Sequence, residues 1–116
     1  MKQSLENRTK AFALEIIRFT ANLPRNRTAD VLGRQLLKSG TSIGANYREA
    51  GRAESRDDFI HKIGICAKES AETQYWLEIF LEGKLAAAEN SERLRREASE
   101  LLAIFVASGR TAKSSR

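Results

Sequence analysis

Apolar residues recur at steps of three and four along most of the chain, which places them on one side of an α-helix. The first such seam consists of Leu5, Thr9, Phe12, Ile16, Phe19 and Leu23. Pro24 follows directly, and the residue before a proline avoids the helical region. We therefore expect a first helix that ends at this proline, with a loop at residues 25–27.

A second seam with the same spacing consists of Leu32, Leu36, Ser39, Ile43, Asn46 and Ala50. Thr28 is a suitable N-cap for this helix, and Asp30 falls in its first turn, where the helix dipole favours a negative charge. The polar seam residues Ser39 and Asn46 are interpreted as structural, because a buried polar group at such a position sets helix register.

Glycines share a second stripe of the same helix, which consists of Gly33, Leu37, Gly40, Gly44, Tyr47 and Gly51. An internal glycine costs about 0.5–1 kcal/mol relative to alanine, so a row of them indicates the close approach of another backbone. We expect that backbone to be a neighbouring helix, and a nucleic-acid backbone is the alternative. A break of the helix at Gly40 or Gly44 also stays open.

Ser55 and Asp58 have the spacing of a capping box and predict the start of a third helix that runs to about Glu82, with Gly83 as its stop. A fourth helix is predicted from about Ala86 to Ala107, on the seam Leu94, Ala98, Leu101 and Phe105. The fold class expected is all-α, an antiparallel up-and-down four-helix bundle over residues 1–108. Residues 109–116 are expected to form a basic, disordered tail.

The third helix is apolar over more than one face, with Tyr75 and Trp76 beside the apolar arc. So wide an arc predicts that the protein assembles with copies of itself. Tyr75, Trp76 and Phe80 are the candidate oligomer interface. Within the protomer, Leu36, Ile43, Leu77 and Leu101 are the residues expected in the core.

Composition and charge narrow the class of protein. Cys66 is the only cysteine, so an internal disulfide is excluded and a reducing compartment is expected. A membrane span needs about 20 apolar residues, and the sequence contains no such run. It also has no apolar run typical of a signal peptide near its start. We expect a cytoplasmic protein with no membrane partner.

The net charge of +5 is divided unevenly along the chain. Residues 1–56 carry 11 basic and five acidic side chains, residues 57–100 carry six and 10, and residues 101–116 carry three and none. The candidate nucleic-acid-binding residues fall in the first of these segments, at Arg25, Arg27, Arg34, Lys38, Arg48, Arg52 and Arg56. Such residues contact phosphates without reading sequence. A solvated helix face is the alternative interpretation.

Residue types that carry catalysis are scarce. His61 has a carboxylate four residues before it, which is typical of a surface pair, and Cys66 lies on an apolar arc without a histidine at dyad spacing. The Glu-x-x-His pattern of di-iron bundles and phosphate-binding loops are both missing from the sequence. We expect neither an enzyme nor a cofactor or metal.

Three motifs resemble one bacterial family. They are Ser42-Ile43-Gly44-Ala45-Asn46-Tyr47-Arg48-Glu49-Ala50, then Ser55 with Asp58-Phe59-Ile60, then Lys68-Glu69 with Glu72-Thr73 and Tyr75-Trp76-Leu77. The family's founding members are encoded in intervening sequences of the large-subunit ribosomal RNA, and the accessory variability determinant of diversity-generating retroelements is similar to them. The likeness covers about residues 8–108.

This resemblance implies a four-helix protomer assembled as a ring-shaped homopentamer. In the retroelement relatives it implies a basic barrel that engages a reverse transcriptase and nucleic acid. It implies no catalytic residues, and it makes Asn46 and Glu49 a structural polar pair of internal ties on the second helix. The function expected is therefore that of a non-catalytic oligomeric accessory protein that binds structured RNA or DNA. The alternative is a homo-oligomeric protein-interaction scaffold with no nucleic-acid role.

Overall fold

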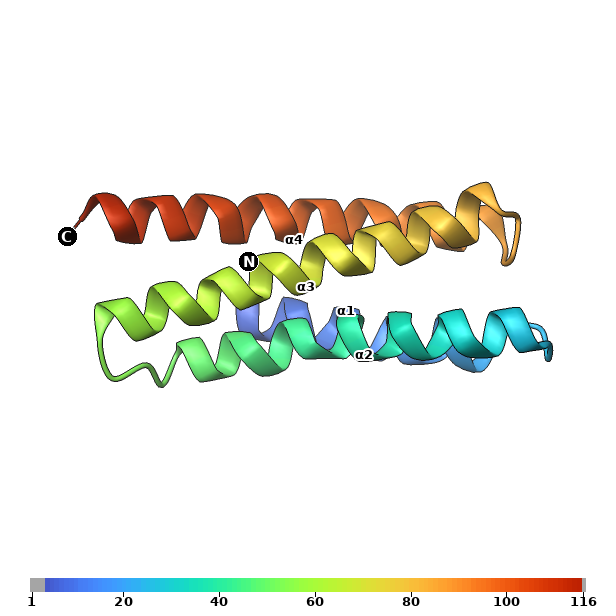
Figure 1. The fold of residues 1–116 in the computed structure, drawn as a ribbon, viewed down its shortest axis with the longest axis horizontal. Coiled ribbons are helices and arrows are strands. Elements are labelled where there is room, and N and C mark those ends of the chain that lie inside the picture. Colours follow the sequence, from blue (N-terminus) through green and yellow to red (C-terminus); the bar gives the residue numbers. More distant parts are fainter. Residues whose placement is uncertain (1–3, 116) are drawn as a thin grey trace.

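Four helices make up most of the chain in the computed structural model, which describes residues 4–115. They are α1 (Leu5–Ala21), α2 (Arg27–Ala50), α3 (Arg56–Glu82) and α4 (Ala88–Ser114). Successive helices run in opposite directions along a body 48 × 28 × 21 Å in extent (Figure 1). The expected all-α, up-and-down four-helix bundle is confirmed.

The helices pack in chain order. α2 and α4 both lie against α3, α1 lies against α2, and α1 approaches α4 only marginally. With 17 residues α1 is the shortest helix, and it begins part-way along α2, as Figure 1 shows. One end of the bundle is therefore built from α2, α3 and α4 without α1.

The predicted core is confirmed. Leu36, Ile43, Leu77 and Leu101 are completely buried, together with Phe12, Ile16, Phe80 and Phe105. The polar seam residue Ser39 is buried too, and it accepts a hydrogen bond of 2.9 Å from the Thr73 hydroxyl of α3. α3 has a wide apolar arc because it packs on α2 with one side and on α4 with the other. The apolar residues of this arc therefore pack against α2 and α4 of the same protomer.

α2 is continuous through its glycines, so the predicted alternative of a break is wrong. A Cβ atom at Gly40 would lie 2.9 Å from Cγ1 of Ile16, and one at Gly44 would lie 3.2 Å from Oγ1 of Thr9. Both neighbours belong to α1. The glycine stripe therefore admits a neighbouring helix, as expected, and sets the close spacing of α1 and α2.

The helix ends follow capping rules, with three corrections. Ser55 caps α3 as predicted and accepts from the Asp58 amide at 3.0 Å, but Asp58 in turn accepts from the Glu54 amide, one residue before the expected one. The N-cap of α2 is Asn26, whose Oδ1 accepts from Ala29 N at 2.8 Å, so Thr28 already lies inside the helix. Asparagine is among the best N-cap residues.

The third correction concerns the tail. Residues 109–114, expected to be disordered, are the last turns of α4. The seam of α4 continues at Ser108 and Ala112, which are both half-buried, and this spacing was a signal for helix. Helix packing against α3 outweighs the polar composition of the segment.

Candidate functional site

The seven predicted basic residues do not form one patch. Arg25, Arg27, Arg34 and Lys38 lie in the connection before α2 and in its first half, and Arg48, Arg52 and Arg56 lie at its other end. Arg27 and Arg48 are 21 residue steps apart, which corresponds to about 30 Å along the helix. One contiguous ligand surface of small size cannot include both sets.

Ion pairs engage some of these side chains and leave others open. Arg34 pairs with Asp30 at 2.9 Å and Arg48 pairs with Glu6 at 3.2 Å, both with exposed partners. Arg25, Arg27 and Arg52 form no ion pair with the residues that the structure describes. Exposed pairs contribute little to stability, so Arg34 and Arg48 can exchange their carboxylates for another anion.

The second set gains two members from the far end of the chain. The guanidinium of Arg56 donates a hydrogen bond to the carbonyl of Ser115, the C-cap of α4. α3 and α4 pack against each other, so the last turns of α4, with Arg110 and Lys113, lie at the same end of the bundle as the start of α3. The resulting surface is called the basic end, and it comprises Arg48, Arg52, Arg56, Arg110 and Lys113.

Carboxylates also occur at the basic end. They are Glu6, Glu49, Glu54, Asp57 and Asp58. Glu6 is paired with Arg48, and Asp58 accepts from a backbone amide. Between the start of α1 and the end of α2 lies a hollow of about 480 Å³, which Arg48 and Arg52 line. The half-buried rings of Tyr47 and Phe59 line it too.

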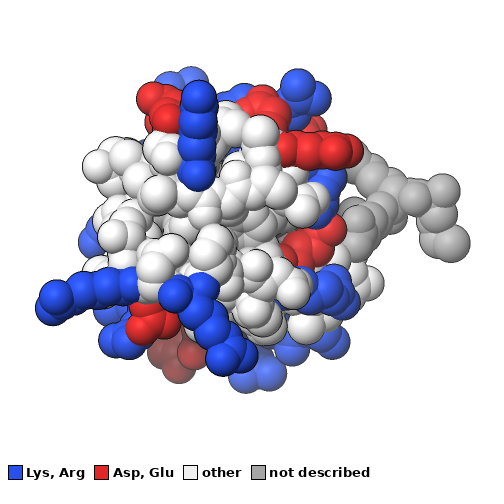
Figure 2. Space-filling model, turned by 90° about the vertical axis from the view of Figure 1, so that its right-hand side faces the viewer, with Lys and Arg blue, Asp and Glu red and all other residues white. Residues whose placement is uncertain are grey.

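A larger groove lies at the opposite end of α2. It is called the α1–α2 groove, has a volume of about 1040 Å³ and is lined by Ile17, Thr20, Ala21, Leu23, Pro24, Arg25, Asn26, Arg27, Ala29, Asp30, Gly33, Arg34, Leu37 and Thr41. Ile17 is 45% exposed and Leu37 is 36% exposed. Figure 2 views this end of the molecule and shows uncharged surface in the middle, with Lys and Arg side chains projecting around its lower half.

The three candidate interface residues on α3 have different environments. Tyr75 is 53% exposed, and its ring meets that of the half-buried Trp76 edge to face, 5.1 Å between centroids. The Trp76 indole N–H donates to Glu72. Phe80 is fully buried, with its ring 5.6 Å from that of Phe19 in the protomer core. The prediction of Phe80 as an interface residue is therefore wrong, because no part of it is accessible to a second chain.

The predicted polar pair on α2 also needs a correction. The Asn46 amide donates to the carbonyl of Ser42 at 2.8 Å, one turn earlier in the same helix. Glu49 is exposed. Asn46 is an intrahelical tie, whereas Glu49 is not an internal tie of the protomer.

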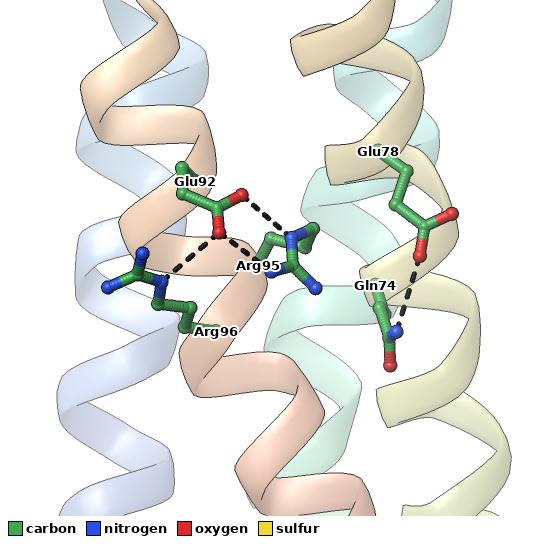
Figure 3. A network of polar contacts seen from close by, with 5 residues as sticks. All are labelled: Gln74, Glu78, Glu92, Arg95 and Arg96. Carbon is green, nitrogen blue, oxygen red and sulfur yellow. Dashed lines mark hydrogen bonds and ion pairs between the residues drawn. The ribbon is translucent and has the colours of Figure 1, made fainter.

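Three arginines in the first half of α4, namely Arg93, Arg95 and Arg96, pair with carboxylates. Arg93 pairs with Glu15 of α1 at 2.8 Å, and Glu92 accepts from both Arg95 and Arg96 (Figure 3). The hydrogen bonds from Arg95, and then from Arg96, lower the pKa of Glu92 to about 2. Across from them, the Gln74 amide of α3 donates to Glu78 at 3.2 Å (Figure 3). Arg95 is only 27% exposed in its pair, whereas Arg93 and Arg96 are exposed and, like Arg34 and Arg48, can exchange their carboxylates for another anion.

Cys66, the single cysteine of the sequence, is buried in the core. Burial raises the pKa of the Cys66 thiol to about 12, so this cysteine is unreactive at neutral pH. Within residues 4–115, no three His, Cys, Asp or Glu side chains are placed to hold a metal ion. None of the four helices, over the residues described, is apolar enough over sufficient length to cross a membrane.

Comparisons with known proteins agree with the fold and the sequence motifs. Residues 2–107 match the family described as 23S rRNA-intervening sequence protein. The chain is similar to a crystal structure of a protein with unknown function from the S23 ribosomal protein family of Bacteroides thetaiotaomicron, with 35% identity and a TM-score of 0.83. The match covers 90% of this chain and 94% of that one. No curated protein matches the chain. The chain belongs to the 23S rRNA-intervening sequence protein family.

Proposed function

We propose that this protein is a non-catalytic, homo-oligomeric accessory protein that binds structured RNA or DNA through its basic end. The packing of α4 against α3 carries the proposal, because the end of α4 then lies beside the start of α3 and five basic side chains fall at one end of the bundle. The family's link to a ribosomal RNA insertion supports a partner of this class.

Phosphate contact is the mode of binding that these residues suit. Arginine presents a planar fork of donors that matches phosphate oxygens, and such contacts carry no sequence information. The carboxylates at the same end keep the affinity of one protomer low. Several protomers held together would present several such ends, and linked contacts raise weak affinities by orders of magnitude.

Salt dependence provides the test. A fluorescent RNA hairpin should bind tightly at about 50 mM salt and lose affinity steeply as salt rises, because binding releases counterions. Changing Arg48, Arg52 and Arg56 together to Glu should abolish binding. A milder variant, Arg52→Glu with Arg110→Glu, keeps both the Arg56 contact and the pair of Arg48 with Glu6, and should still weaken binding at least tenfold.

Arg18→Glu with Lys84→Glu is the matched control. Both residues are exposed, lie outside the basic end and change the net charge by the same amount. This control should bind RNA better than the Arg52 and Arg110 variant. Size-exclusion chromatography with light scattering, run on every variant, separates lost binding from lost assembly. An intact oligomer that fails to retain nucleic acid at about 50 mM salt contradicts the proposal.

That outcome would leave the second candidate, a homo-oligomeric protein-interaction scaffold. Large apolar side chains that remain exposed on the protomer favour it, namely Leu14, Ile17, Val31, Leu37, Tyr75 and Val106. Contacts built on apolar burial keep their strength as salt rises, so the same titration distinguishes the two candidates.

A further inference from the structure

The α1–α2 groove has the dimensions of a helix-binding site. Its lining on α2 runs from Arg27 to Thr41, and 14 residue steps along a helix span about 21 Å, or some four turns. Gly33 leaves its floor without a side chain, while Ile17 and Leu37 present apolar surface to solvent. An amphipathic helix places anchors every three or four residues into a groove of this kind.

Charge around the groove selects the occupant. Residues 17–41 contain five basic side chains and one acidic side chain, Asp30. Arg25 and Arg27 line the groove and form no ion pair with any residue that the structure describes. A helix that fits must therefore combine an apolar strip with carboxylates, because complementary charge selects partners and suppresses wrong ones.

The second half of α3 has this combination. Residues 69–82 contain four glutamates and no lysine or arginine. Their outer surface is called the α3 ridge and comprises Glu72, Tyr75, Trp76, Glu78, Ile79 and Glu82. Glu72, Tyr75, Ile79 and Glu82 recur at steps of three and four and therefore lie in one row along the helix. Tyr75 is the most exposed large apolar residue of the described chain.

The ridge cannot fill the groove of its own protomer, because α3 packs on the protomer with its opposite side, where Thr73 and Leu77 are buried, and leaves Tyr75 exposed. We propose that the α1–α2 groove of one protomer receives the α3 ridge of a second copy, with Tyr75 as the anchor and the groove arginines facing the ridge glutamates. This inference rests on the self-assembly proposed above. Because groove and ridge are different surfaces, the contact is head-to-tail, and such contacts close into rings when the rotation permits.

Two single substitutions separate the surfaces. Leu37→Glu adds a carboxylate to the groove and Tyr75→Arg adds a cation to the ridge, and both sites are exposed enough for the fold to tolerate the change. Each variant alone should shift from an oligomer to a 13.0 kDa monomer in native mass spectrometry at micromolar concentration. The matched control is Val106→Glu, which alters an α4 side chain 37% exposed, much as Leu37 is, and should assemble normally.

Mixing the two variants is the decisive measurement. The Leu37 variant keeps an intact ridge and the Tyr75 variant keeps an intact groove, so one productive contact remains. Equal amounts should form at least a heterodimer through this contact. Such a dimer supports the pairing of groove and ridge.

Each other outcome has a distinct meaning. If the wild-type chain is monomeric, the proposed self-assembly fails. If the wild type assembles and either variant assembles equally well, self-assembly stands and the pairing is wrong. A mixture that stays monomeric, while both variants keep wild-type helicity by circular dichroism, also overturns the pairing. A groove-to-groove dimer would be broken by Leu37→Glu and untouched by Tyr75→Arg.

Discussion

The two neighbours of α1 are held in opposite ways. Toward α2 the helices approach so closely that glycine is required, with Ile16 seated over Gly40. Toward α4 the backbones stay apart, and long charged side chains bridge the gap, with Arg8 bonded to both oxygens of Glu97 at 2.7 Å and Arg93 to Glu15. The contact between α1 and α2 depends on the fit of side chains to glycines, and the contact between α1 and α4 depends on ion pairs. Different substitutions should therefore weaken the two contacts.

The largest loss of stability is expected at the contact between α1 and α2. Ile16→Ala removes a completely buried side chain and should lower the free energy of unfolding by about 2–5 kcal/mol. Urea denaturation followed by circular dichroism measures this loss. A loss below about 0.5 kcal/mol, within the range of surface substitutions, would mean that α1 contributes little to the fold.

Gly40→Ala is the next largest perturbation. Its new Cβ would lie 2.9 Å from Ile16, which is buried and cannot move aside, so overpacking should outweigh the gain in helix propensity. The net loss expected is about 1–3 kcal/mol. Gly64→Ala on α3 is the control, because a Cβ there meets nothing within 4 Å. It should raise stability by about 0.5–1 kcal/mol.

A combined variant sharpens the argument. In Ile16→Ala with Gly40→Ala, the second change fills part of the space left by the first. The double variant should therefore be more stable than the sum of the single losses predicts. If the loss of stability in the double variant equals the sum of the two single losses, Gly40 is not needed to accommodate Ile16.

The ion pair between α1 and α4 should contribute a smaller free energy. Arg8 and Glu97 are both about one-quarter exposed, at 27% and 24%, so solvent screens the pair partly. A double-mutant cycle with Arg8→Ala and Glu97→Ala should give a coupling of about 0.5–1 kcal/mol, which falls as salt rises. The exposed pair of Arg34 and Asp30 serves as the comparison and should couple by about 0.3–0.5 kcal/mol. Equal couplings would remove the distinction between the two sites.

The smallest expected effect is a loss of stability at acidic pH through Glu92. Arg95 and then Arg96 lower the pKa of Glu92 from its ordinary 4.5 to about 2. A carboxyl whose folded pKa is depressed contributes stability above its unfolded pKa and loses it as the pH falls toward the folded value. Its contribution should therefore decline between about pH 4.5 and pH 2, and NMR titration of the Glu92 side chain should show the low pKa. Arg95→Met should move the titration back toward pH 4.5.

Local features were predictable because their causes are local. The seams of α1 and α2, the cap at Ser55 and the stop at Gly83 depend on residues within a few positions of one another. The burial of Leu36 and Ile43 follows from the same periodicity. The glycine stripe even indicated that a backbone would approach α2. None of these inferences required knowledge of which helices become neighbours.

The candidate binding surfaces were only partly predictable, since they depend on contacts between distant segments. Leu37 was named as a member of the glycine stripe, but the groove also needs Ile17 of α1 beside it. The basic residues were named from sequence, yet their division between two ends follows from the length of α2 and the direction of the helices.

The amino-acid sequence by itself determined the four helices and the faces that they bury, because spacing and capping act over one or two turns. The tertiary structure alone decided that Phe80 packs against Phe19, that Arg93 of α4 pairs with Glu15 of α1, and that Arg56 contacts the end of α4. The physical reason is distance along the chain. A hydrogen bond over 59 residues forms only after helix packing has brought its ends together, and no local pattern encodes it.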